Sequence, residues 1–198
     1  MNIAGRKVLI FVEHEFEDLE MWYPILRLRE AGITVDLAGL KAQTDYLGKY
    51  GIPVTTNLSF EQVKSKDYAG LLIPGGWAPD KLRTYPHVIQ IAKDFQRMKK
   101  PIAAICHAPW VLISAKIVDG YTMTSFQSLK TDLENAGAAW VDKEVVVDRN
   151  MISARMVADL PAFVKEFICI LENSTHSTSS PIWKIVQRYP DQDESCLR

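Results

Sequence analysis

The sequence has little cysteine: three residues among 198, at positions 106, 169 and 196, with no Cys-x-x-Cys spacing. Such a sparse and odd-numbered set excludes a disulfide framework and gives no zinc-binding pattern. The sequence therefore predicts no metal site, and a reducing, cytoplasmic location is the expected one.

An excess of one charge and long apolar runs are also lacking. The 23 Lys and Arg residues nearly balance 24 Asp and Glu, for a net charge of -1. This balance favours neither a nucleic acid nor an anionic membrane as partner. The apolar run at residues 8–12 is too short for a membrane span, and no small-residue cleavage pattern follows it. A small-molecule substrate fits this composition better.

Motifs of nucleotide binding and of glutamine amidotransferases are missing as well. The paired glycines Gly75-Gly76 match neither GxGxxG nor GxxxxGK[ST], so no nucleotide or other cofactor is predicted. An amidotransferase would need a late His-x-Glu segment, and the late histidine His176 is followed by Ser177-Thr178.

What the sequence does contain is a regular alternation of short apolar runs with amphipathic segments. Buried strands separated by helices predict an α/β fold with a mostly parallel sheet covered by helices on both faces. We expect strands at residues 7–12, 34–38, 71–73, 102–105, 138–141, 144–148 and 151–154, and helices at 18–31, 87–98, 126–135 and 157–171, with another starting near 109.

The last third of the chain predicts a hairpin at the margin of the sheet, followed by a segment of polar composition. Residues 145–151 indicate a hairpin with its turn near Arg149-Asn150, which would add an antiparallel margin to the sheet. Residues 173–180 are polar and too poor in apolar side chains to join a core. We therefore expect one α/β domain over residues 1–172, followed by a polar linker and C-terminal tail over 173–198.

Cys106 is placed where the sequence predicts an abrupt turn from strand to helix. The apolar run 102–105 ends at this thiol, and Pro109 suits the first turn of a helix. Ala104 and Ala108, two positions to either side, are small enough for a sharp nucleophile turn. The following helix N-terminus would favour the thiolate, so Cys106 is predicted to be a reactive nucleophile.

Two alternatives limit this interpretation. A cysteine that ends an apolar strand is often only a packing residue. Neighbouring side chains at such a turn usually diverge, so we expect His107 to contribute its backbone N–H and orient groups rather than take the thiol proton.

Loops at the carboxyl ends of neighbouring parallel strands should meet near Cys106. The first, residues 13–18, has five ionisable side chains in six positions. Acids such as Glu17 there either complement a helix dipole or include one buried carboxyl that relays a proton beside the sulfur. A metal bound by His14 and these acids is disfavoured, because the spacing matches no standard ligand set.

The second loop follows the predicted strand 71–73. Gly75 and Gly76 either form a simple turn or leave backbone N–H groups free for an oxyanion hole. Asp80 either caps the next helix or takes part in the site. Trp77 in this loop and Trp110 after the predicted corner would flank and narrow the pocket, which favours small substrates.

Four motifs occur in order within residues 6–172: Glu15-Phe16-Glu17-Asp18-Leu19-Glu20, Pro74-Gly75-Gly76-x-Ala78-Pro79-Asp80, Ala104-Ile105-Cys106-His107-x-Pro109 and Ala158-Asp159-Leu160. Together they resemble the PfpI family, within the superfamily that includes the Parkinsonism-associated deglycase. The joint match is far more specific than any single motif.

This resemblance implies a flavodoxin-like three-layer sandwich with Cys106 as nucleophile and Glu17 hydrogen-bonded to its sulfur. It also implies an oxyanion hole from the Gly76 and His107 amides. Asp80 stands where the family usually has a Glu that reaches His107 from a second subunit, so a homo-oligomer is implied, at least a dimer, with a hexamer as the larger candidate.

The sequence departs from the family pattern at a few positions. Ala108 replaces the usual Gly, Trp77 a residue that is often basic or small, and Val157 a frequent Pro. Asp80 is one methylene shorter than Glu, which makes its contact with His107 the least secure part of the implied triad.

The function that these residues predict is a cysteine-dependent stress-response enzyme. Its substrates would be small reactive carbonyls, glyoxal or methylglyoxal, or their glycation adducts. The alternatives are an intracellular cysteine peptidase and a non-enzymatic redox sensor or chaperone that acts through oxidation of Cys106.

Overall fold

The computed structural model describes residues 3–174 of the chain. Within that range seven strands form one sheet in the order β10-β11-β7-β6-β1-β2-β5. All neighbouring pairs are parallel except the antiparallel pair β10 and β11. The strands are β1 (Lys7–Phe11), β2 (Thr34–Gly39), β5 (Leu58–Ser59), β6 (Gly70–Ile73), β7 (Ile102–Ile105), β10 (Val145–Asp148) and β11 (Met151–Ala154).

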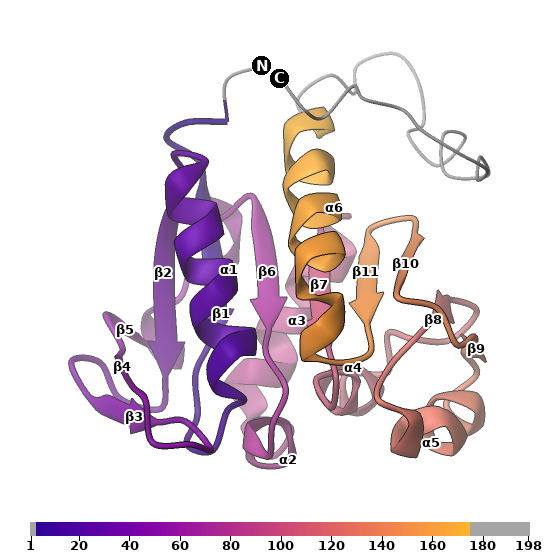
Figure 1. Ribbon diagram of the computed structural model, residues 1–198. Coiled ribbons are helices and arrows are strands. Elements are labelled where there is room, and N and C mark those ends of the chain that lie inside the picture. Colours follow the sequence, from indigo (N-terminus) through magenta and orange to yellow (C-terminus); the bar gives the residue numbers. More distant parts are fainter. Residues whose placement is uncertain (1–2, 175–198) are drawn as a thin grey trace.

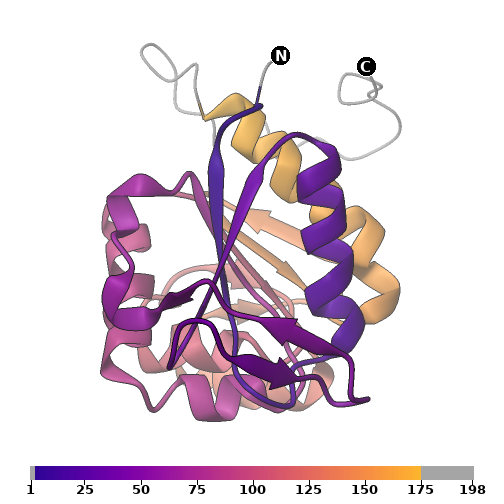
Figure 2. The same cartoon turned by 90° about the vertical axis from the view of Figure 1, so that its left-hand side faces the viewer.

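Helices cover both faces of this sheet. Helices α1 and α6 lie on one face and α3 and α4 on the other, as the two perpendicular views show (Figures 1 and 2). In α3, the buried side chains Val88, Ile91, Ala92 and Phe95 follow the helical repeat that places one face on the core. The helices are α1 (Asp18–Glu30), α2 (Ala78–Leu82), α3 (Pro86–Arg97), α4 (Pro109–Ser114), α5 (Lys130–Asn135) and α6 (Leu160–Asn173), with short 3-10 turns η1 (Phe60–Gln62), η2 (Ser65–Asp67), η3 (Gln127–Leu129) and η4 (Val157–Asp159).

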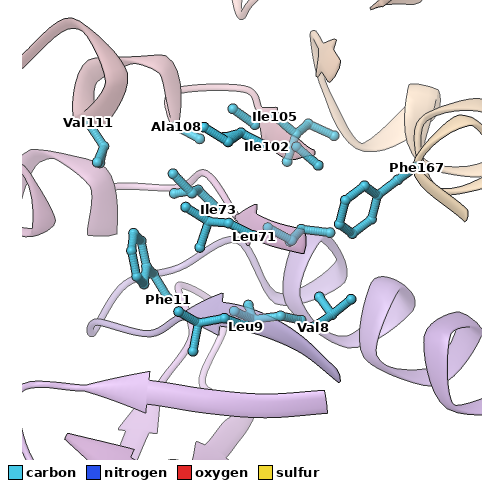
Figure 3. Close-up of a cluster of buried hydrophobic side chains, with 14 of the residues drawn as sticks. Val8, Leu9, Phe11, Leu71, Ile73, Ile102, Ile105, Ala108, Val111 and Phe167 are labelled. Atoms are coloured by element: carbon cyan, nitrogen blue, oxygen red, sulfur yellow. The ribbon is translucent and has the colours of Figure 1, made fainter. Parts of the chain in front are cut away.

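The central strands are apolar on both faces because helices cover both. Every residue of β6 and β7 is buried, and so are the last four of β1. Figure 3 shows side chains of these strands, including Leu9 and Leu71, packed together, with Phe167 of α6 at one side of the cluster. The core is thus continuous through the sheet, and the carboxyl ends of its strands meet at one edge of the molecule.

The predicted fold class is confirmed, and so is the antiparallel margin at Arg149. The predicted helix 126–135 is shorter than expected, because its first turns form η3 before α5 begins. The predicted strand 138–141 is reduced to β9 (Ala139–Trp140), which pairs with β8 (Thr122–Met123) outside the main sheet. The sequence patterns did not reveal the small antiparallel pair β3 (Asp45–Leu47) and β4 (Pro53–Thr55), which matters for the site below.

No helix in the described part of the chain is long and apolar enough to cross a membrane. Most of the predicted linker and tail, residues 175–198, lies outside the described residues. The division into one domain and a tail therefore stays a prediction.

Candidate active site

The sharp turn predicted at Cys106 is present between β7 and α4. Cys106 has a φ of 62°, in the left-handed region that L-residues other than Asn and Asp rarely occupy. Ala104 and Ala108 are fully buried, and the Ala108 N–H closes the turn by donating to the carbonyl of Ile105 at 2.9 Å. The strained backbone places the Cys106 thiol at the carboxyl edge of the sheet.

The loops after β1 and β6 meet beside this turn. Phe16 and Gly76 form an isolated antiparallel bridge, and the Glu17 N–H donates to the Gly75 carbonyl at 3.2 Å. Glycine is required at both Gly75 and Gly76, because a side chain at either position would collide with its neighbours. A Cβ on Gly75 would lie 2.6 Å from the Cβ of Cys106, and one on Gly76 would lie 2.4 Å from the Glu15 carbonyl oxygen.

The carboxyl that faces the sulfur is that of Glu20, so the expected hydrogen bond from Glu17 is wrong. Glu20 is 1% exposed, forms a side-chain hydrogen bond with Cys106, and accepts the Gly75 N–H at 2.8 Å. Helix α1 begins at Asp18, so Glu20 lies in its first turn on the buried side, together with Met21.

Glu17 precedes that helix and has an extended backbone. Its carboxylate lies 3.6 Å from the ammonium nitrogen of Lys49, in the turn between β3 and β4. Glu17 therefore belongs to the rim of the site, and its charge helps to raise the pKa of Glu20.

His107 also differs from the expectation, because its ring does not diverge from Cys106. Its Nδ1 atom lies 3.1 Å from the sulfur, within hydrogen-bonding distance for a thiol. Its Nε2 atom lies 3.4 Å from the hydroxyl of Ser128. The left-handed turn at Cys106 and the packing of the ring bring the two neighbouring side chains together.

Three aromatic rings hold the imidazole of His107. Phe126 stacks on it with ring centroids 4.9 Å apart, and Trp110 and Trp77 contact it at 5.1 and 5.5 Å. The predicted pocket residues Trp77 and Trp110 are thus brought to the site. The sequence analysis missed Phe126 and Ser128, which lie about twenty positions further along the chain and have no local motif.

Burial dominates the electrostatics of the site. Burial and the neighbouring Glu20 raise the pKa of the Cys106 thiol to about 12, so the expected thiolate is wrong for the free protein. Burial, opposed by the hydrogen bond from Gly75, raises the pKa of Glu20 to about 8. Burial also lowers the pKa of His107, helped by the charge of Lys49. At neutral pH the imidazole is therefore an uncharged base, and Glu20 carries a proton.

The backbone N–H groups of Gly76 and His107 point at the sulfur. Both donate hydrogen bonds to it and act to lower its pKa, against the larger effect of burial. Two convergent amides beside a nucleophile are the usual arrangement of an oxyanion hole.

Asp80 lies on α2 and is exposed. The described part of the chain records no contact between Asp80 and His107, so a contact across a subunit interface stays a prediction. No group of three His, Cys, Asp or Glu side chains suited to a metal ion occurs among the described residues.

A cavity of about 640 Å³ lies away from the thiol, against α4 and α5. It is lined by charged residues that include Lys116 and Asp119, and it contains neither Cys106 nor Glu20. The candidate site therefore rests on the groups gathered around the Cys106 sulfur and not on this cavity.

The sheet order and the sharp turn at Cys106 define an α/β protein with a Cys–His–Glu cluster at the carboxyl edge of its strands. The model of the DJ-1/PfpI family matches residues 6–169, and the chain belongs to that family. The resemblance seen in the motifs is therefore confirmed.

Relatives match over nearly their whole length. "Deglycase PH1704" of Pyrococcus horikoshii is 42% identical over 84% of this chain and 99% of its own. "General stress protein 18" of Bacillus subtilis is 41% identical over 85% of this chain and 99% of its own. A crystal structure of DJ-1beta from Drosophila melanogaster is 28% identical, with a TM-score of 0.78 over 84% of this chain and 89% of that one.

Proposed function

We propose that the protein is an enzyme that uses Cys106 as a nucleophile toward small reactive carbonyls, glyoxal or methylglyoxal, or toward their adducts. The observation that supports this most directly is the set of groups around one sulfur atom: the His107 Nδ1 at 3.1 Å, the Glu20 carboxyl and two backbone amides. The name deglycase given to a relative at 42% identity agrees with this assignment.

The first step is addition of the thiol to the aldehyde. His107 Nδ1 takes the proton from the thiol while the sulfur–carbon bond forms, which is possible because its pKa is lowered and the ring is neutral. The electrons of the carbonyl double bond move to oxygen, which the Gly76 and His107 amides hold. Glu20, protonated at neutral pH, gives its proton to that oxygen and yields a hemithioacetal.

With methylglyoxal, the ionised Glu20 then takes the proton from the hemithioacetal carbon and returns it to the neighbouring carbon through an enediol. This internal rearrangement gives a thioester of lactate and needs no external oxidant or reductant. Water cleaves the thioester, so lactate leaves and Cys106 regains its proton. The overall change is methylglyoxal plus water to lactate.

Replacement of Cys106 tests the proposal. We expect Cys106→Ala to remove lactate formation from methylglyoxal by at least about a thousandfold, because no other group can form the thioester. Lactate is measured directly, and Cys169→Ala, a change at a cysteine on α6, is the matched control with wild-type activity. Lactate formation that survives in Cys106→Ala would exclude this mechanism.

The same two variants address the alternatives from the sequence. A cysteine peptidase would cleave casein or a fluorogenic peptide in the wild type and fail to do so in Cys106→Ala. A redox sensor would gain oxygen atoms on Cys106 under mild peroxide, which intact mass and peptide mapping detect. Peptide cleavage or oxidation without any turnover of carbonyls would favour the corresponding alternative.

A further inference from the structure

Lys49 lies at the rim of the site and has no role in the mechanism above. It belongs to the turn between β3 and β4, and its side chain is 36% exposed. It contacts two groups, the Glu17 carboxylate at 3.6 Å and the ring of Tyr50 at 5.2 Å from its centroid. The ammonium group has three donors, so these neighbours leave capacity for a ligand.

The backbone of this turn is fixed against the catalytic loop. The buried carboxylate of Asp18 accepts the N–H groups of Tyr50 and Ile52 at 2.8 and 2.9 Å. The Lys49 N–H donates to the carbonyl of Phe16 at 2.8 Å, and Phe16 in turn pairs with Gly76. Figure 1 shows the β3–β4 pair at the end of the molecule where the strands finish. The backbone of Lys49 is therefore held against Phe16, the residue that pairs with Gly76.

The charge of Lys49 reaches the groups that surround the sulfur. It acts to lower the pKa values of both His107 and Glu20. The other lysine near this rim, Lys81, is engaged by Glu15 at 3.2 Å. Arg83 stacks on Trp110 and donates to Ser114 at 3.0 Å. Lys49, whose charge acts on both His107 and Glu20, is thus a cation near enough to the site to meet an anionic ligand there.

We propose that Lys49 is a specificity-determining residue that binds a carboxylate on the substrate while the substrate's carbonyl carbon lies at Cys106. The inference rests on the proposed function and deepens it: the preferred substrates are carbonyl adducts of amino acids or thiols that bear a carboxylate. Glu17 shares the same ammonium and repels an anion in proportion to the anion's charge, so a monoanionic carboxylate is tolerated better than a dianionic phosphate.

Alkylation tests the anion site without any assumption about catalysis. Iodoacetate carries a carboxylate where iodoacetamide carries an uncharged amide, and both reagents alkylate the Cys106 sulfur. The ratio of their rates cancels any change in the thiol pKa. We expect Lys49→Met to lower the ratio of iodoacetate to iodoacetamide rates by about fivefold, and Glu17→Gln to raise it. Lys49→Arg should restore most of the ratio, and Lys81→Met is the matched control that leaves it unchanged.

Measurement of catalytic turnover provides a second test of the proposed carboxylate site. Hemithioacetals of methylglyoxal with N-acetylcysteine and with N-acetylcysteine amide differ only in that same carboxylate. We expect Lys49→Met to lower kcat/KM for the acid about fivefold relative to the amide, mainly through KM. Equal alkylation ratios in wild type, Lys49→Met and Lys81→Met would overturn the proposal. Absence of turnover with a preserved alkylation effect would instead refute the proposed function and leave the anion site standing.

Discussion

At the edge of the sheet where the parallel strands begin, the Lys100 ammonium donates to three carbonyl oxygens, those of Ser65, Lys66 and Tyr68, at 2.6 to 3.0 Å. At the edge where they end, the buried Glu20 carboxyl accepts one backbone N–H and otherwise faces a thiol. Burial shifts the pKa of both groups against their charged forms. Lys100 has a full set of partners, whereas Glu20 has a partner that can react.

The surroundings of the two groups extend this contrast. Near Lys100, Asn150 donates to the Lys100 carbonyl at 3.0 Å and to Gln96 at 2.9 Å, while Tyr121 donates back to Asn150 at 3.1 Å. Near Glu20, the backbone is strained at Cys106, and the amides of Gly76 and His107 point at the sulfur. Satisfied polar groups stabilise one edge, and strained or incompletely paired groups gather at the other, where the proposed chemistry takes place.

Separate replacement of Glu20, beside the sulfur, and of Glu17, at the rim, is the sharpest way to break this comparison. Glu20→Gln keeps an oxygen for the Gly75 N–H but cannot give up or take a proton, so we expect methylglyoxal turnover to fall about a hundredfold. Glu17→Gln, the matched control three residues earlier, should change turnover by less than about threefold. Steady-state kinetics on both variants checks this, and a larger loss in Glu17→Gln would return the proton relay to that residue.

The stability of Glu20→Gln relative to wild type should increase with pH, although the variant is expected to be less active. The raised pKa of Glu20 means that the folded protein binds this proton more tightly than the unfolded chain does. Its stabilising effect is complete below the unfolded pKa of about 4.5 and is lost as pH rises through about 8. We therefore expect the glutamine variant to be more stable than wild type by about 2 kcal/mol at pH 9.

Urea unfolding at pH 4.5 and pH 9 measures this difference, with Glu17→Gln again as control. The advantage of Glu20→Gln should be much smaller at the lower pH, where Glu20 is protonated in the folded protein and about half protonated in the unfolded chain. Equal unfolding midpoints at both pH values would mean that Glu20 is not held in its neutral form by burial.

At the carboxyl edge, the sequence could predict local features but not the identity of the carboxyl beside the sulfur. The turn at Cys106 is a local feature, because a short apolar run, flanking alanines and Pro109 suffice to define it. The run of acids after β1 indicated a carboxyl near the sulfur, but its identity depends on where α1 begins and which side faces the sheet. Glu20 could have been recognised as the acid that shares the buried side of α1 with Met21 and Pro24.

Contacts between segments that are far apart in the sequence could not be predicted from local sequence patterns. The stacking of Phe126 on His107 and the position of Lys49 depend on loops that fold back over the sheet edge. The prediction that the Cys106 thiol is ionised was wrong for a related reason. The helix after Cys106 has six residues, and its N-terminal dipole is outweighed by burial, which depends on the packed loops around the sulfur.

Replacement of Lys100 tests the other edge and should leave the chemistry untouched. Lys100→Met keeps the aliphatic stem but removes the donor to three carbonyl oxygens, and we expect a loss of about 2 kcal/mol in the free energy of unfolding. Lys93→Met, at an exposed position on α3, is the matched control and should change stability by less than about 0.5 kcal/mol. Urea unfolding measures both. At temperatures where Lys100→Met remains folded, its methylglyoxal turnover should equal that of wild type, because none of the lost contacts involves the carboxyl edge. Reduced turnover in the folded variant would show that the two edges are coupled and that the division of roles between them does not hold.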